Sequence, residues 1–451
     1  MSESRRKFLK GAALSAAGIT LGTSAKAMSS SSYNRIIGAN DRINVAIAGL
    51  GRRLGAYYEP IAAKESNARL IYLCDVMKSQ RDRAAEKFSE YINYKPKLEN
   101  DIRNILADSE VDAIINATPD HWHAPMAFMA LEAGKDVYLE KPVSHNPREN
   151  ELLVAYQKKY DKLIQMGAQQ RSSPESIEII GEIHNGRIGD VYKALTFYSN
   201  DRGRVVNPEK APPPEGLDWE LFQGPAPRKP YEHDTWNYNW HWYGWDYGTA
   251  EMGNNATHEL DIARWALDVD YPQHVFVESD KRHFKDDGWT MYDTMDATFI
   301  FPGNKIIQWD GKSRNGQKTY GSGRGTIIYG SEGSVYVDRG GYKLFDRGGK
   351  LIKDSASASN EAGTALGGGG DMSTRHVQNF FNTMRGKEKL NLPIEVGAKS
   401  QHLTHLANIA SRIGKPLEVS TENGRIYDRE AMKLWTRNYE PGWEPKLETG
   451  I

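Results

Sequence analysis

Two side chains capable of acid–base chemistry directly follow a short apolar run. Glu140 and Lys141 come after Val137-Tyr138-Leu139 and precede Pro142. The apolar run predicts a buried strand, and open parallel sheets bind ligands beyond the carboxyl ends of their strands. Pro142 disfavours a helix at Lys141, and the bond between them can be cis. We therefore expect Glu140 and Lys141 to face a ligand; a polar strand end without function is the alternative for Lys141.

A glycine-rich turn follows another predicted strand, Ile43–Ala48. Gly49 and Gly51 would let the backbone turn tightly and approach a pyrophosphate, and we assign Arg52 to the same cofactor site. Gly55 comes one residue later than the third glycine of G-x-G-x-x-G. A plain glycine turn is therefore the alternative.

Asp75 ends the next predicted strand, residues 70–74. It falls at about the distance where dinucleotide folds bind a ribose hydroxyl. A carboxylate would repel a 2′-phosphate, so Asp75 favours NAD, although Arg81 and Arg83 leave NADP possible. A helix N-cap is the alternative role for Asp75.

A third polar strand end runs from Thr118 to His123, after the predicted strand 111–117. We assign Thr118 and His123 to the cofactor site, and packing of the cofactor loop is favoured over catalysis for both His121 and His123. The two histidines form a His-x-His pair without an identifiable third ligand, so we expect no metal site.

Alternating strands and helices up to Gly167 predict a doubly wound α/β domain. Its other expected elements are strands 136–139 and 163–167 and helices 79–91, 124–133 and 148–159. The following part changes to period-two strands, which predict an antiparallel sheet. We expect strands 191–198, 274–278, 291–301, 305–309, 324–329 and 333–338, helices 175–185, 374–384 and 398–412, and a long loop at 200–248.

Length and composition suit a two-domain globular protein: 451 residues with a formal net charge of -1. This balance argues against a nucleic-acid partner, and the single cysteine, Cys74, excludes a disulfide framework. Residues 1–27 contain Arg5-Arg6, an apolar stretch and Ala25-Lys26-Ala27, which resembles a Tat signal peptide. A disordered basic start is the alternative. We expect export by the Tat machinery to the periplasm without a stable membrane anchor.

The glycine-rich turn, Asp75, Glu140-Lys141-Pro142 and the segment Gly253–Trp265 occur in an order that resembles the glucose–fructose oxidoreductase/inositol dehydrogenase (Gfo/Idh/MocA) family. The similarity covers roughly residues 42–439. It implies an NAD(P)-binding Rossmann domain at 28–167 and an α+β domain at 168–451 for substrate binding and oligomerisation. It also implies hydride transfer with a sugar or polyol carbon, and carries catalytic roles over to Lys141 and His258.

One departure concerns Asn254, where many relatives carry an aspartate that acts with the histidine in proton transfer. An amide cannot serve as a general base but can hydrogen-bond a hydroxyl, so we assign Asn254 and Asn255 to the substrate. Histidine has a suitable pKa for accepting the substrate proton. A structural role at the start of a helix is the alternative for His258.

Further substrate contacts are expected from Arg171 and from the aromatic segment 236–247, through Trp240, Trp242 and Tyr243. Aromatic faces would stack on a pyranose, but an arm that docks onto another subunit is equally compatible. For Arg171 an ion pair between the domains is equally compatible.

These features predict a periplasmic oxidoreductase that transfers hydride between tightly bound NAD and a secondary alcohol or keto group of a sugar or glycoside. The alternatives are an NAD-dependent glycoside hydrolase acting by transient oxidation and elimination, and a non-catalytic sugar-binding protein. We expect a homodimer or homotetramer.

Overall fold

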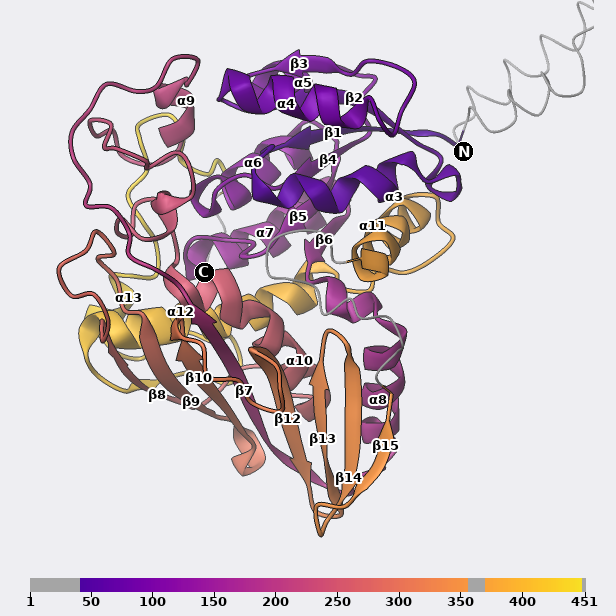
Figure 1. Ribbon diagram of the computed structural model, residues 1–451, viewed down its shortest axis with the longest axis vertical. Coiled ribbons are helices and arrows are strands. Elements are labelled where there is room, and N and C mark those ends of the chain that lie inside the picture. The colour runs from indigo at the N-terminus through magenta and orange to yellow at the C-terminus, as the bar shows by residue number, and fades with distance from the viewer. Residues whose placement is uncertain (1–40, 356–369, 448–451) are drawn as a thin grey trace, which may run out of the picture. The chain divides into compact units, whose positions relative to one another are not determined.

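The computed structural model describes residues 41–355 and 370–447 (Figure 1). The expected signal peptide, residues 1–27, lies outside the described residues. A parallel sheet with the order β3-β2-β1-β4-β5-β6 forms the first half of the fold. Its strands are β1 (Ile43–Ala48), β2 (Ala68–Cys74), β3 (Lys97–Glu99), β4 (Ala113–Asn116), β5 (Asp136–Glu140) and β6 (Ile164–Gly167).

Helices cover both faces of this sheet, which explains why strands such as β1 and β4 are mostly apolar. One core contains residues of α4 and α11, and the other contains residues of α5, α6 and α7. The helices are α3 (Tyr58–Ala62), α4 (Lys78–Phe88), α5 (Ile102–Leu106), α6 (Asp120–Glu132), α7 (Pro147–Tyr160) and α11 (Gly370–Met384). The doubly wound domain expected from the sequence is therefore confirmed.

The second sheet is mostly antiparallel and has the order β15-β14-β13-β12-β7-β10-β9-β8-β16, with β11 paired to β7 at the side. Its strands are β7 (Val191–Asp201), β8 (His274–Asp280), β9 (Thr294–Ile300), β10 (Ile306–Lys312), β11 (Arg314–Asn315), β12 (Arg324–Gly330), β13 (Gly333–Asp338), β14 (Gly341–Asp346), β15 (Leu351–Asp354) and β16 (Leu417–Glu418). Only the β7–β10 pair is parallel within the second sheet.

One face of the second sheet packs against α8 (Pro174–His184), α10 (Thr257–Leu267) and α12 (Ile394–Ile413) in a single large core. The opposite face carries a small separate cluster and the exposed ring of Phe276. Within the described ranges, no helix combines the length and apolar character needed to cross a bilayer.

The chain does not divide into two continuous domains at Gly167. Helix α11 follows β15 of the second sheet in sequence, yet Val377, Phe380 and Phe381 are buried with Tyr57 in the core of the first sheet. Trp443 and Leu447, near the end of the described chain, pack against the other core of that sheet. The first sheet is thus held on both faces by residues from the far end of the sequence.

The start of α6 differs from the expected helix 124–133: the helix begins four residues earlier, at Asp120. Pro125 lies inside it and has no N–H to donate to the carbonyl of His121. That carbonyl instead accepts a hydrogen bond of 2.6 Å from Arg437. A side chain from the end of the chain therefore lets the helix continue through the proline.

Candidate active site

A large cleft lies at the carboxyl ends of the parallel strands. It is walled on one side by the turns after β1, β2, β4 and β5, and on the other by the long loop after β7, by residues 254–258 and by two arginines of the second sheet. Of the predicted site residues, those that line it are Gly49, Gly51, Arg52, Asp75, Thr118, His123, Glu140, Lys141, Trp240, Asn254, Asn255 and His258.

The turn after β1 brings backbone close to backbone at Gly49. This residue has φ +86°, and an added Cβ would lie 2.3 Å from the carbonyl oxygen of Ala117. An added Cβ at Gly51 would meet nothing within 4 Å, so the backbone there faces open space. The two glycines therefore supply the tight turn and the open approach that a pyrophosphate needs.

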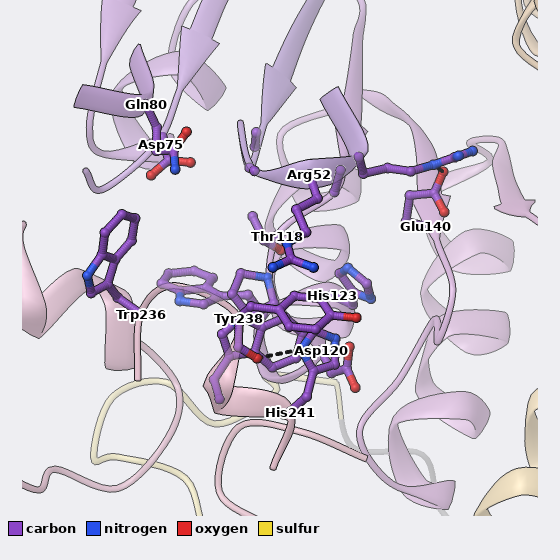
Figure 2. A pocket seen from close by; sticks show the side chains of 18 of the residues that line it. Arg52, Asp75, Gln80, Thr118, Asp120, His123, Glu140, Trp236, Tyr238 and His241 are labelled. Atoms are coloured by element: carbon purple, nitrogen blue, oxygen red, sulfur yellow. Dashed lines mark hydrogen bonds and ion pairs between the residues drawn. The ribbon is translucent and has the colours of Figure 1, made fainter. Parts of the chain in front are cut away.

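Asp75 and Gln80 lie at one end of the cleft, and Trp236 faces them (Figure 2). Asp75 accepts backbone hydrogen bonds from Leu50 (2.8 Å) and Met77 (2.9 Å), which fix its carboxylate at the end of β2. Each oxygen keeps a lone pair for a ribose hydroxyl. This end of the cleft fits the adenosine half of a dinucleotide.

Neither nearby arginine supplies a phosphate contact beside Asp75. Arg81 donates to the backbone carbonyl of Asp75, and Arg83 donates to that of Leu50 at 2.6 Å. Neither side chain lines the cleft. Because both guanidinium groups donate to backbone carbonyls and neither lines the cleft, they provide no group there that would favour the 2′-phosphate of NADP.

His123 lines the cleft from the first turn of α6 and has one ring nitrogen without a partner among the described residues. Its Nδ1 lies 2.5 Å from the carbonyl oxygen of Pro142, whereas its buried Nε2 has no hydrogen-bond partner among the described residues. Burial lowers the pKa of His123 to about 4, so the ring is neutral at pH 7. Nδ1 must donate to the carbonyl, which leaves Nε2 as an acceptor for a hydroxyl or amide of a bound cofactor.

Lys141 is the residue in the cleft best suited to proton transfer. Its peptide bond to Pro142 is cis, and its Nζ donates to the carbonyl oxygen of Asn254 at 2.6 Å. Burial lowers the pKa of Lys141 to about 8, against the opposing charges of Glu140 and Asp120. At neutral pH a fraction of the side chain is therefore the free amine, the form that accepts a proton.

Asp120 was not among the predicted site residues, although it lines the cleft at the start of α6. It accepts hydrogen bonds from the backbone N–H (3.1 Å) and the hydroxyl (2.6 Å) of Thr249. Burial raises the pKa of Asp120 to about 6, while these hydrogen bonds and the charge of Lys141 oppose the rise. Asp120 is thus ionised at pH 7 and favours the protonated form of Lys141.

Glu140 anchors the strand end rather than facing a ligand freely. Its Oε1 accepts from Arg53 (2.8 Å), from Tyr57 (2.8 Å) and from Gln169 (3.0 Å). Despite burial, the guanidinium of Arg53 and these hydrogen bonds hold the pKa of Glu140 below its usual value. A fixed carboxylate at this point positions Lys141, the next residue.

The amides of Asn254 and Asn255 are both held by Glu251, which receives hydrogen bonds of 2.9 Å from each. They lie in the π-helical turn Met252–Ala256, directly before α10. Because Nδ2 of Asn254 is used in this way, its side-chain oxygen remains available to accept from a hydroxyl. This arrangement suits substrate binding but provides no base.

His258 lines the cleft from the first turn of α10, and its ring forms no hydrogen bond with any described residue. Burial, followed by the charges of Arg339 and Arg324, lowers the pKa of His258 well below its ordinary value. The ring is therefore neutral at pH 7 and can accept a hydrogen bond from a ligand.

The aromatic segment of the long loop closes over the cleft. The guanidinium of Arg52 lies 3.9 Å from the centre of the Tyr238 ring, so the turn after β1 and this loop touch across the cleft (Figure 2). Trp240 stacks on His241 with 3.5 Å between ring centres. The three rings line the cleft.

Three predicted substrate residues lie elsewhere. Trp242 is buried against Trp289, with 3.9 Å between ring centres, and the hydroxyl of Tyr243 donates to a backbone carbonyl at 2.8 Å. Arg171 forms a buried ion pair with Asp261 at 2.7 Å. None of the three lines the cleft, so our assignment of these residues to the substrate is corrected. Their interactions within the protein use the groups that we expected to bind it.

Several side chains of the cleft were not predicted. Trp236, Tyr238 and His241 belong to the aromatic segment, and its composition alone indicated a binding surface. Which of its rings face the cleft depends on backbone turns that the composition does not predict. Arg324 is the first residue of β12 and Arg339 lies in the turn after β13, where no local pattern indicates a site.

Two family models match this chain. One is described as "Oxidoreductase family, NAD-binding Rossmann fold" and matches residues 43–168; the other is described as "Oxidoreductase family, C-terminal alpha/beta domain" and matches residues 196–339. Among curated proteins, a "Glycosyl hydrolase family 109 protein" of Shewanella baltica is 25% identical over 272 residues, or 57% of this chain and 53% of that protein. The match thus spans about half the length of this relative.

Solved structures share the fold at low sequence identity. The aldose-aldose oxidoreductase from Caulobacter crescentus, complexed with glycerol, has a TM-score of 0.61 and 18% identity over 84% of this chain and 100% of that chain. The WlbA dehydrogenase from Bordetella pertussis, in complex with NADH and UDP-GlcNAcA, has a TM-score of 0.60 and 18% identity over 84% of this chain and 99% of that chain.

Proposed function

This chain belongs to the Gfo/Idh/MocA family of oxidoreductases with an NAD-binding Rossmann domain, and from that premise we propose that it oxidises or reduces a hydroxyl-bearing carbon of a sugar or glycoside. One observation carries the proposal: Lys141, with a pKa lowered to about 8, lies in the same cleft as the glycine turn and Asp75. In this proposal the cleft combines a nucleotide site with a proton acceptor.

Bound NAD would supply the acceptor of the hydride. The neutral amine of Lys141 takes the proton of the substrate hydroxyl, and Asp120 stabilises the ammonium that results. Neutral His258 and the side-chain oxygen of Asn254 accept hydrogen bonds from substrate hydroxyls and so orient the reacting carbon. In the reverse direction, the ammonium of Lys141 returns the proton to the carbonyl oxygen.

We further propose that the cofactor is retained and regenerated within the cleft by a second sugar. The contact between Arg52 and Tyr238 would hinder its release. The Tat-like sequence at residues 1–27 supports export of a folded, cofactor-loaded protein to the periplasm, where free nucleotide is not readily exchanged. In this proposal Trp236 and Trp240 cover opposite parts of the bound ligands.

The test replaces Lys141. We expect Lys141→Met to lower the rate of nicotinamide reduction by roughly 10²–10⁴-fold, the range for loss of a general base, while nucleotide stays bound. Lys158→Met, on the exposed face of α7, is the matched control. This role would be refuted if, with any sugar that reduces the nicotinamide of the wild-type protein, Lys141→Met were as active as the control.

A second candidate function is NAD-dependent glycoside hydrolysis. The match to the Shewanella baltica protein, named a glycosyl hydrolase, favours it. In such a reaction, transient oxidation of a neighbouring C–OH to a carbonyl by NAD would acidify the adjacent C–H and allow elimination of the aglycone. Water would then add to the resulting unsaturated sugar, and NADH would reduce the carbonyl back to the alcohol. Product analysis separates the two candidates: hydrolysis yields a free aglycone with no net change in NAD, whereas the oxidoreductase yields a keto-sugar or lactone.

A further inference from the structure

Six cationic side chains line the cleft, and five of them have partners within the protein. Arg53 pairs with Glu140 at 2.8 Å, and Arg324 pairs with Glu259 at 2.7 Å. The other cations that line it are Arg52, Lys141, Arg202 and Arg339. Arg202 lies 3.6 Å from Glu251, Arg52 lies over the Tyr238 ring, and Lys141 donates to a carbonyl.

Arg339 is the exception. It lies in the tight turn between β13 and β14, and its side chain forms no hydrogen bond or ion pair with any residue in the ranges 41–355 and 370–447. The adjacent carboxylate of Asp338 is used elsewhere, because it accepts from the hydroxyl of Tyr336 (2.6 Å) and from the N–H of Gly340 (2.8 Å). Gln170 donates to the carbonyl of Asp338 at 3.0 Å and holds the turn in place.

Arg339 lines the same cleft as His258 and Lys141. Among charged groups, Arg339 makes the largest contribution to lowering the pKa of His258. Burial and the like charge of Arg324 lower the pKa of Arg339 itself to about 9, so it remains protonated at pH 7. The charges of Glu259 and Glu140 partly offset these effects, but neither carboxylate, nor any other in the described ranges, forms an ion pair with Arg339. An anionic ligand would supply that partner.

We propose that the substrate is a sugar or glycoside bearing a carboxylate, and that Arg339 binds this carboxylate beside His258. The inference rests on the proposed function and names its substrate class. A guanidinium and a carboxylate are both planar and can form two parallel hydrogen bonds. A neutral sugar would leave Arg339 unpaired, so the carboxylate decides which sugars bind.

The test compares matched sugars on the full-length, nucleotide-loaded protein: glucuronate against glucose, and galacturonate against galactose. Binding is followed by tryptophan fluorescence, since Trp236 and Trp240 line the cleft, and turnover by nicotinamide absorbance. We expect the acid of at least one pair to bind at least tenfold more tightly than its neutral partner. Arg339→Gln should reduce this ratio at least tenfold, and Arg339→Lys should restore part of it because the charge returns.

Arg347→Gln is the matched control, because Arg347 is an exposed arginine in the turn between β14 and β15. It should keep the wild-type ratio. Equal or tighter binding of the neutral sugar in both pairs would overturn the inference, as would an unchanged ratio in Arg339→Gln. If neutral sugars reduce the bound nucleotide and acids do not, the proposed function stands and the inference fails. If the protein binds neither NAD nor NADP, the proposed function itself fails.

Discussion

Replacement of Asp120 by asparagine should shift the pH dependence of turnover downward. Asp120 and Glu140 both raise the pKa of Lys141 against the effect of burial, which brings it to about 8. Asparagine removes one of these negative charges with little change of shape. Loss of a nearby opposite charge shifts a pKa by about 1 unit or more, which corresponds to about 1.4 kcal/mol.

The sign follows from the chemistry of the oxidation direction. The neutral amine of Lys141 accepts the proton, so the rate falls as pH drops through the pKa of Lys141. The midpoint should lie near pH 8 in the wild-type protein, where the pKa is about 8. In Asp120→Asn it should lie about one pH unit lower. The assay is the initial rate of nicotinamide reduction by one sugar, at saturation, across this pH range.

A matched control separates charge from hydrogen bonding. Thr249→Ala removes the hydroxyl that donates to Asp120 at 2.6 Å but leaves the carboxylate in place. Without this hydrogen bond the pKa of Asp120 rises, but the carboxylate keeps part of its charge, so the midpoint should move down by less than in Asp120→Asn. A midpoint that does not move in Asp120→Asn, or moves upward, would refute the coupling between Asp120 and Lys141 and with it the assignment of Lys141 as the proton acceptor.

Three further changes test how the cleft is built. Glu140→Gln leaves Arg53 without its carboxylate and should lower the free energy of unfolding by roughly 3–5 kcal/mol in urea denaturation at pH 7. Because the pKa of Glu140 is lowered in the folded protein, its stabilising contribution is present above the unfolded pKa of about 4.3 and is lost as pH falls below it. A loss under 1 kcal/mol at pH 7 would contradict the ion-pair argument. Gly49→Ala should abolish nucleotide binding, measured by calorimetry, because the new Cβ would lie 2.3 Å from a backbone carbonyl oxygen at φ +86°; unchanged affinity would show that this turn does not shape the site. Tyr238→Ala should speed nucleotide release roughly two- to fivefold, as expected for loss of about 0.5–1 kcal/mol of cation–π contact with Arg52. Tyr238→Phe keeps the ring and should release nucleotide at the wild-type rate. If Tyr238→Ala also releases nucleotide at the wild-type rate, the contact does not contribute to cofactor retention.

Much of the architecture was predictable because it follows from local apolar runs. Strands β1, β4, β5 and β6 are buried along nearly their whole length, and β2 is buried mainly at its carboxyl end. Short apolar runs mark β1, β2, β4 and β5 in the sequence. Strand β3 was missed because Lys97–Glu99 is short and mostly polar, at the edge of the sheet. The early start of α6 was missed because Arg437, which satisfies the carbonyl freed by Pro125, is far away in sequence.

The site residues likewise fall into those that local sequence predicts and those that depend on tertiary contacts. Gly49, Asp75 and Lys141 each follow a strong strand signal, and the parallel topology brings their turns to one edge of the sheet. Arg171 and Arg339 show where sequence reasoning ends. Both are arginines at element ends, but one finds a buried carboxylate and the other does not. Only the tertiary structure decides which of the two is free to bind a ligand.

The central claim is that this cleft holds NAD and uses it on a sugar. The most direct measurement is to denature the purified full-length protein, identify any released nucleotide by mass spectrometry, and expose the native protein to a panel of neutral and acidic sugars and glycosides while following nicotinamide absorbance. The account predicts stoichiometric NAD or NADH whose redox state changes with one class of sugar. A protein that carries no nucleotide, and binds neither NAD nor NADP when they are added, would contradict it.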